Sequence, residues 1–190
     1  MSRINSAILA IFTAAIIAAS VLYVIRANPV HEAIPEALAA LQADPSPKPL
    51  PVTSFVDAEG HTHSPSEFKG SVVILNMWAT WCAPCVRELP AIARLQATLG
   101  RNSVSIVTVN ASHDSAAETE KFLKAHDAAS LPPYRDPDLS LLSAFGAQGL
   151  PFSVVIDAKG REIARASGPM NWDDPAAIAY FKSLGAHAAS

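Results

Sequence analysis

The stretch that decides the fold is residues 72–90, VVILNMWATWCAPCVRELP. Its first part, Val72–Trp78, is apolar except for Asn76 and begins with β-branched residues, which predicts a buried central strand. Cys82 and Cys85 follow, and apolar residues then recur at helical spacing. The stretch therefore predicts a strand that leads through a Cys-x-x-Cys segment into a helix.

The two cysteines are the only ones in the chain, so any sulfur chemistry takes place between them. Their spacing allows a reversible disulfide, and a thiol at a helix N-terminus is favoured as the thiolate by the helix dipole and the free N–H groups. A dithiol that opens and closes is the leading interpretation. A static disulfide, which over so short a loop stabilises little, and two inert buried thiols are the alternatives.

Composition narrows the class of protein. The chain has 190 residues, of which 50% are hydrophobic, and a formal net charge of -3, which offers no electrostatic basis for binding nucleic acid. Two cysteines are too few for a disulfide scaffold or an all-cysteine zinc site. His61 and His63 offer at most a weak metal-binding pair and are interpreted as exposed loop residues, so no metal site is expected.

The N-terminal segment is a second strong signal. Residues 7–25 are almost wholly apolar, a run about as long as a helix that spans a bilayer, with Arg3 before it and Arg26 after it. This pattern predicts an uncleaved membrane anchor over residues 1–26. A cleaved signal peptide, which has a shorter apolar region, and a buried soluble helix are the alternatives. The flanking charges barely decide the orientation.

The rest of the chain divides into a spacer and a domain. Proline is dense after the anchor, so residues 27–49 are interpreted as a semi-extended spacer and residues 50–190 as the folded domain. Within the domain, we expect strands at 51–57, 72–78, 104–110, 152–157 and 162–166, and helices at 64–68, 84–99, 116–126, 139–145 and 174–184. This order predicts an α/β fold with a mixed sheet whose last two strands are antiparallel.

Two motifs carry a family resemblance. The segment Trp81-Cys82-Ala83-Pro84-Cys85 after a strand, and Gly149-Leu150-Pro151 before a later strand, resemble the active-site motif and the cis-proline loop of TlpA/ResA/CcmG-type proteins. These are membrane-anchored bacterial thiol–disulfide oxidoreductases. The resemblance covers about residues 50–187. It implies a thioredoxin fold, with a central mixed β-sheet flanked by helices and an N-terminal transmembrane helix.

The resemblance also implies a role for each motif residue. Cys82 would be the exposed nucleophile with a low pKa, and Cys85 the more buried thiol that resolves the mixed disulfide. Pro84 fits the first helical turn, and Trp81 would flank the nucleophile as an apolar docking surface. A cis Leu150–Pro151 bond would lie beside the sulfurs, where its backbone pairs with the partner peptide. The Cys82–Cys85 disulfide is the only redox group expected, with no separate cofactor.

One departure from thioredoxin is informative. Thioredoxin itself has a buried aspartate where Asn76 stands, whereas TlpA/ResA-type proteins place a glutamate three residues after the second cysteine, and Glu88 matches it. At that spacing Glu88 faces the same side of the helix as Cys85. A partly buried carboxyl there would have a raised pKa and would shuttle the proton of the resolving thiol. The alternative is a surface glutamate paired with Arg87 or Arg94.

The direction of electron flow rests on the resemblance. It implies a reductant in the periplasm that receives electrons from a membrane donor of the DsbD/CcdA type and reduces cysteine pairs of apocytochrome c or of respiratory oxidase copper sites. The implied protein is single-pass in the inner membrane, with a cytoplasmic N-terminus. The alternative is a metallochaperone that holds Cu(I) on the two thiolates. The Trp-Cys-x-Pro-Cys frame argues against a third class, a peroxidase of the thioredoxin superfamily. Trp78 and Trp172 are interpreted as packing residues.

Overall fold

The computed structural model of the chain describes residue 16, residues 33–100 and residues 104–188. The chain separates into two units, Met1–Ala33 and Ile34–Ser190, and the second contains the cysteine pair. The predicted anchor over residues 1–26 lies, apart from residue 16, outside the described residues. Among the helices that are described, none is both long enough and apolar enough to cross a membrane.

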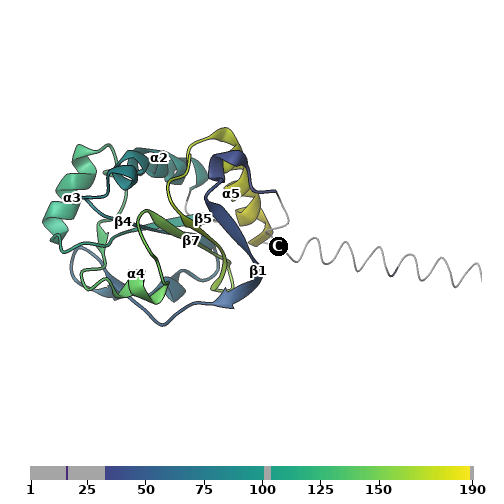
Figure 1. Cartoon of the computed structure of the whole chain (residues 1–190), viewed down its shortest axis with the longest axis horizontal. Helices are drawn as coiled ribbons and strands as arrows, with labels where there is room; N and C mark the ends of the chain where they lie inside the picture. Colours follow the sequence, from purple (N-terminus) through teal and green to yellow (C-terminus); the bar gives the residue numbers. More distant parts are fainter. Residues whose placement is uncertain (1–15, 17–32, 101–103, 189–190) are drawn as a thin grey trace, which may run out of the picture. The chain divides into compact units, whose positions relative to one another are not determined.

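A mixed β-sheet forms the centre of the second unit (Figure 1). Its middle strand, β4 (Val72–Trp78), is buried at every position, as its apolar sequence predicts. β4 pairs in parallel with β5 (Val104–Asn110) and antiparallel with β7 (Phe152–Ile156), which pairs antiparallel with β8 (Arg161–Ser167). In the described part of the chain the strand order is β1 (Leu41–Pro49), β8, β7, β4, β5, β6 (Tyr134–Arg135), β2 (Phe55–Val56) and β3 (Thr62–His63). The thioredoxin-like α/β fold and the antiparallel last pair are thus confirmed.

Helices cover both faces of this sheet. Figure 1 shows α2 (Ala83–Leu99) and α5 (Pro175–Ala188) over one face and α4 (Ser140–Ala144) over the other. The odd-numbered residues of β4 join Leu141 and Phe145 in the core on the α4 side. Because side chains alternate along a strand, Asn76 and Trp78 face the other way, towards α2 and α5. Among the other described elements are α3 (Ala116–Ala125), η2 (Glu36–Leu38) and η3 (Pro65–Phe68).

The folded domain begins earlier than predicted. Leu41–Pro49 forms β1, which pairs antiparallel with β8 and shifts register between Ala43 and Lys48. Leu38, before it, is fully buried. Proline density led to the interpretation of residues 27–49 as a spacer, and for residues 41–49 that interpretation is wrong. β1 is an edge strand, where proline is tolerated because one side of the strand needs no ladder hydrogen bonds.

The next predicted strand is shorter than expected. Of residues 51–57 only Phe55–Val56 forms a strand, β2, which pairs with β3 (Thr62–His63) as an antiparallel hairpin. At η3, within the predicted helical segment 64–68, Ser64 and Glu67 form a capping box. The hairpin and η3 therefore form a small unit at the edge of the sheet opposite β1.

Candidate active site

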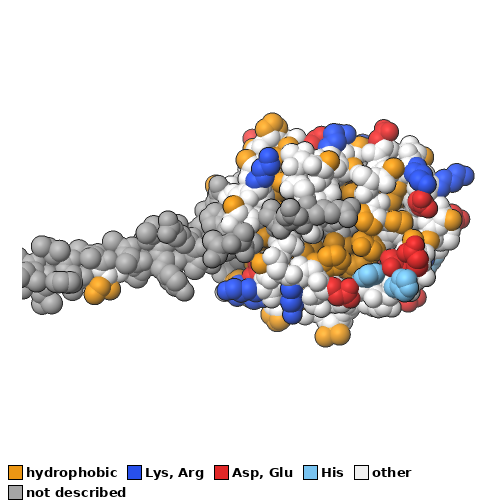
Figure 2. Space-filling view, turned by 180° about the vertical axis from the view of Figure 1, so that it is seen from behind, with side chains coloured by type: hydrophobic (Ala, Val, Ile, Leu, Met, Phe, Trp, Pro, Cys, Tyr) orange, Lys and Arg blue, Asp and Glu red, His pale blue; other side chains and the backbone are white. Residues whose placement is uncertain are grey.

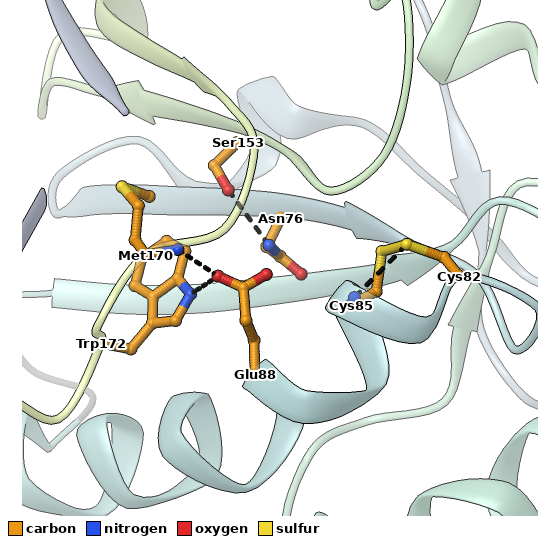
Figure 3. Close-up of a disulfide and its surroundings, with 7 residues drawn as sticks. All are labelled: Asn76, Cys82, Cys85, Glu88, Ser153, Met170 and Trp172. Atoms are coloured by element: carbon orange, nitrogen blue, oxygen red, sulfur yellow. Dashed lines mark hydrogen bonds between the residues drawn. A yellow bond between two sulfur atoms is a disulfide. The ribbon is translucent and has the colours of Figure 1, made fainter. Parts of the chain in front are cut away.

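The cysteine pair lies at the N-terminus of α2, which follows β4 in the chain. Cys82 and Cys85 form a disulfide, with their Cα atoms 5.3 Å apart. Cys82 is the N-cap residue of α2, and its Sγ accepts a hydrogen bond from the backbone N–H of Cys85 at 3.3 Å (Figure 3). Ala83 and Pro84 form the first turn, where the missing N–H of proline leaves no helical hydrogen bond unmade. The position at a helix N-terminus, which stabilises a thiolate, is confirmed.

Exposure at the motif differs from the prediction. In the disulfide form Cys82 is only 5% exposed and Cys85 1% exposed, so the expected exposure of Cys82 is wrong for this state, although it is the more exposed of the two. The large side chain of the motif that faces solvent is Trp81, at 71%. A large apolar side chain exposed beside a buried disulfide is a feature expected of a docking surface.

The second motif lies at the same end of the sheet. The Leu150–Pro151 peptide bond is cis, as the resemblance implied. Phe152, the next residue, pairs with Met77 near the end of β4. Register therefore brings Pro151 and the cysteine motif to neighbouring strand ends. Leu150 also packs against the core on the α4 side, and the carbonyl of Pro151 accepts a hydrogen bond from Gly168 at 3.0 Å.

Glu88 is a buried carboxyl group one turn beyond Cys85. It is 5% exposed, and its Oε1 accepts two hydrogen bonds at 2.6 Å, from the backbone N–H of Met170 and from Nε1 of Trp172 (Figure 3). Its Oε2 is also buried and has no hydrogen-bond partner among the described residues. Burial raises the pKa of Glu88 from 4.5 to about 7, although the two hydrogen bonds and the nearby Arg87 act in the opposite direction.

The surface ion pair that was the alternative for Glu88 is therefore ruled out. Arg94 pairs instead with Asp173, at 2.7 Å. The interpretation of Trp172 as a packing residue is incomplete, because its ring is buried and stacks on Phe181 but its indole N–H also binds Glu88. Trp172 follows Glu88 by 84 residues, and no local pattern in the sequence links the two.

In the view of Figure 3, Asn76 lies between Glu88 and the disulfide. Its Nδ2 donates to Oγ of Ser153 at 3.0 Å, which fixes the carboxamide, while the buried Oδ1 finds no partner in the described structure. A carboxamide does not titrate. Of these two buried side chains, only Glu88 can therefore take up or release a proton.

His61 and His63 lie away from the cysteine pair, at the edge of the sheet formed by the β2–β3 hairpin. Oδ2 of Asp57 lies 3.0 Å from Nδ1 of His61 and 3.1 Å from Nε2 of His63, and Nδ1 of His63 lies 3.0 Å from Glu67. Figure 2 shows histidine and acidic side chains gathered on one face. Ligand atoms of Asp57, Glu59 and His61 lie within 4.8 Å of one another, and Glu59 and His61 are exposed. This cluster is on the β2–β3 hairpin, separated from β4 by β5 and β6.

Comparison with known proteins agrees with this site. The Redoxin family matches residues 45–180. The thiol-disulfide oxidoreductase ResA of Geobacillus thermodenitrificans is 32% identical over 118 residues, 62% of this chain and 67% of that protein. A Chlorobium tepidum protein assigned as the thiol:disulfide interchange protein DsbE superposes with a TM-score of 0.61 at 27% identity, covering 77% and 99% of the two chains. The exposed lipoprotein thioredoxin of Streptococcus pneumoniae gives 0.58 at 28% identity, covering 70% and 98%.

Proposed function

Because this chain belongs to the redoxin family and is a thiol–disulfide oxidoreductase of the ResA type, we propose that it works as a reductant of cysteine pairs in other proteins outside the cytoplasm. The observation that carries the proposal is Glu88, a buried carboxyl group one helical turn beyond Cys85 with a pKa raised to about 7. Near neutral pH such a group is present both as the carboxylate and as the acid, which suits it to accept and release a proton.

The reaction starts from the dithiol. The thiolate of Cys82, favoured by the N-terminus of α2, attacks one sulfur of a target disulfide, and the other target sulfur leaves as a thiolate that takes up a proton. Cys85 then loses its thiol proton, for which the carboxylate of Glu88 is the acceptor, and attacks the sulfur of Cys82. The Cys82–Cys85 disulfide forms as the bond between Cys82 and the target sulfur breaks. That sulfur leaves as a thiolate and takes up a proton, so the target, reduced by two electrons, leaves as a dithiol.

The partners follow from this direction of electron flow. The disulfide must be reduced again by a dithiol donor, and we propose a membrane protein of the DsbD/CcdA type in that role. The targets are cysteine pairs of apocytochrome c or of oxidase copper sites, which must be reduced before they bind haem or copper. Residues 1–26 would anchor the chain in the inner membrane, with the N-terminus in the cytoplasm and the domain in the periplasm. Trp81 and the backbone at Leu150–Pro151 would contact the target, and the cysteine pair would need no separate cofactor.

The decisive measurement is the reduction potential of the Cys82–Cys85 pair. A value well below about -200 mV supports a reductant, whereas a value near about -120 mV would identify an oxidant and overturn the proposed direction. Cys82→Ser should abolish reduction of a peptide disulfide, and Cys85→Ser should accumulate the mixed disulfide with the target. Capture of the partner on Cys85→Ser in the native cell identifies the substrate. Stoichiometric Cu(I) binding by the dithiol form without turnover would favour a metallochaperone instead.

A further inference from the structure

A second carboxyl group lies next to the cysteine motif, on the side opposite in sequence to Glu88. Oδ2 of Asp114, in the loop between β5 and α3, accepts a hydrogen bond from Oγ1 of Thr80 at 2.8 Å. Thr80 stands two residues before Cys82, in the turn closed by the hydrogen bond from the N–H of Cys82 to the carbonyl of Ala79 at 3.1 Å. Asp114 thus reaches across 34 residues of sequence to the segment that carries the nucleophile.

Asp114 is itself held by buried groups. The same Oδ2 accepts hydrogen bonds from Oγ of Ser112 at 2.6 Å and from Nδ2 of Asn110 at 3.1 Å. Nδ2 of Asn110 also donates to Oγ1 of Thr119 in α3 at 3.0 Å. Asn110 and Thr119 are fully buried and Ser112 is 7% exposed. The carboxylate is therefore an anchor fixed to β5 and α3, to which the turn before Cys82 is attached.

The charge on Asp114 strengthens this attachment. Partial burial opposes ionisation, but the hydrogen bonds from Ser112, Asn110 and Thr80, together with His113 nearby, keep the pKa of Asp114 below its usual value. Hydrogen bonds to an ionised acceptor are stronger than those between neutral groups. A backbone hydrogen bond joins the same two loops, from the N–H of Ala111 to the carbonyl of Trp78 at 2.7 Å. This hydrogen bond involves Trp78 and does not reach the turn that contains Thr80 and Trp81.

We propose that Asp114 is a positioning residue for substrate recognition, which holds the Thr80–Trp81 turn so that the exposed Trp81 and the sulfur of Cys82 meet a protein disulfide together. This inference refines the proposed reductase function and rests on it. Trp81 is 71% exposed, so its own packing does little to fix its position. The side-chain tether on its neighbour Thr80 restrains the turn instead, and a turn ordered before binding loses less entropy when a partner docks.

The test separates docking from chemistry. Thr80→Val removes the hydroxyl while preserving the shape of the side chain, and Thr80→Ser keeps the hydroxyl. Thr98→Val is the matched control, because Thr98 donates to the carbonyl of Arg94 within α2, at 2.8 Å, away from the turn. Each full-length protein, in its reduced dithiol form, is mixed in single turnover with a peptide that contains a Cys-x-x-Cys disulfide and, separately, with the small disulfide cystamine. Rates at increasing peptide concentration give a half-saturation concentration and a limiting rate.

The expected result is selective. Thr80→Val should raise the half-saturation concentration for the peptide roughly tenfold, the factor that corresponds to loss of about 1.4 kcal/mol, with the limiting rate and the cystamine rate close to wild type. Thr80→Ser and Thr98→Val should behave as wild type. Unchanged peptide saturation in Thr80→Val overturns the inference, and so does an equal loss of rate on both substrates. If the wild-type dithiol reduces neither disulfide, the proposed function itself fails.

Discussion

Replacing Glu88 with glutamine tests the buried carboxyl group directly. The amide has nearly the same shape, and its oxygen can still accept the hydrogen bonds from Met170 and Trp172, each 2.6 Å long in the structure. What the substitution removes is the ability to ionise. The disulfide form of the protein is the suitable state for the measurement, because Cys82 and Cys85 do not titrate when they are bonded to each other.

The size of the effect follows from the pKa. Burial raises the pKa of Glu88 from 4.5 to about 7, and each pKa unit corresponds to 1.36 kcal/mol, so the ionised side chain costs the folded state about 3 kcal/mol. Below pH 4.5 the side chain is protonated in both the folded and the unfolded state, so this cost is absent and stability is highest. The cost grows as the pH rises from 4.5, and it is complete above pH 7. Wild-type protein should therefore lose free energy of unfolding over this range, and Glu88→Gln should not lose that part.

Urea unfolding at a series of pH values between 4 and 8.5 measures the difference. We expect the free energy of unfolding of Glu88→Gln, relative to wild type, to increase by about 3 kcal/mol from the acid to the alkaline end, with its midpoint between 4.5 and 7. Glu120→Gln is the control, since Glu120 is an exposed carboxylate paired with Lys124. Other titrating groups are common to both proteins and cancel in the difference. Parallel curves for wild type and Glu88→Gln would refute the reasoning.

Three further changes test other parts of the structure. Trp172→Phe removes the indole donor that lowers the pKa of Glu88. In the same unfolding series, the variant's loss of stability should therefore extend to higher pH than that of wild type. Leu41→Ala should lower the free energy of unfolding in urea by about 2–5 kcal/mol, because Leu41 is 4% exposed in β1 and belongs to the core. A loss near zero would mean that residues 41–49 act as a spacer after all. Hydrogen bonds to Asp57 and Glu67 raise the pKa of His63, so wild type should lose stability as the pH rises above 6.5 through that raised pKa, and His63→Gln should lose less.

The central elements could be predicted from the sequence because their signals are local. Val72–Trp78 is a continuous apolar run, and the helix that follows has both a start signal at Pro84 and regular apolar spacing. The edge strand β1 could not be predicted in this way. Its prolines are unfavourable in a strand considered by itself, and they become acceptable only when β8 supplies one neighbour and the other side stays open.

The site likewise combines features that local sequence spacing predicts with features that depend on distant parts of the chain. The disulfide is a property of two residues three apart, and Glu88 lies one turn further along the same helix, so spacing alone brings these groups together. Burial raises the pKa of Glu88, and the two hydrogen-bond donors that oppose this come from the loop before α5. Neither Met170 nor Trp172 belongs to a recognisable motif. Spacing predicted where the carboxyl group would be. It could not predict that a backbone N–H and an indole would both bind one oxygen and leave the other buried without a described partner.

Two carboxyl groups with opposite environments therefore act on the two ends of the cysteine motif. Glu88 is buried beyond Cys85, and its raised pKa of about 7 suits the proton exchange proposed for it. Asp114 is only partly buried and binds the turn before Cys82, and its pKa is lowered, so it remains a fixed anion while the sulfurs react. A proton acceptor must change charge during the reaction, whereas an anchor must not. The two environments match these separate requirements, and for that reason we expect Glu88→Gln to change the pH dependence of exchange and Thr80→Val to change its dependence on substrate concentration.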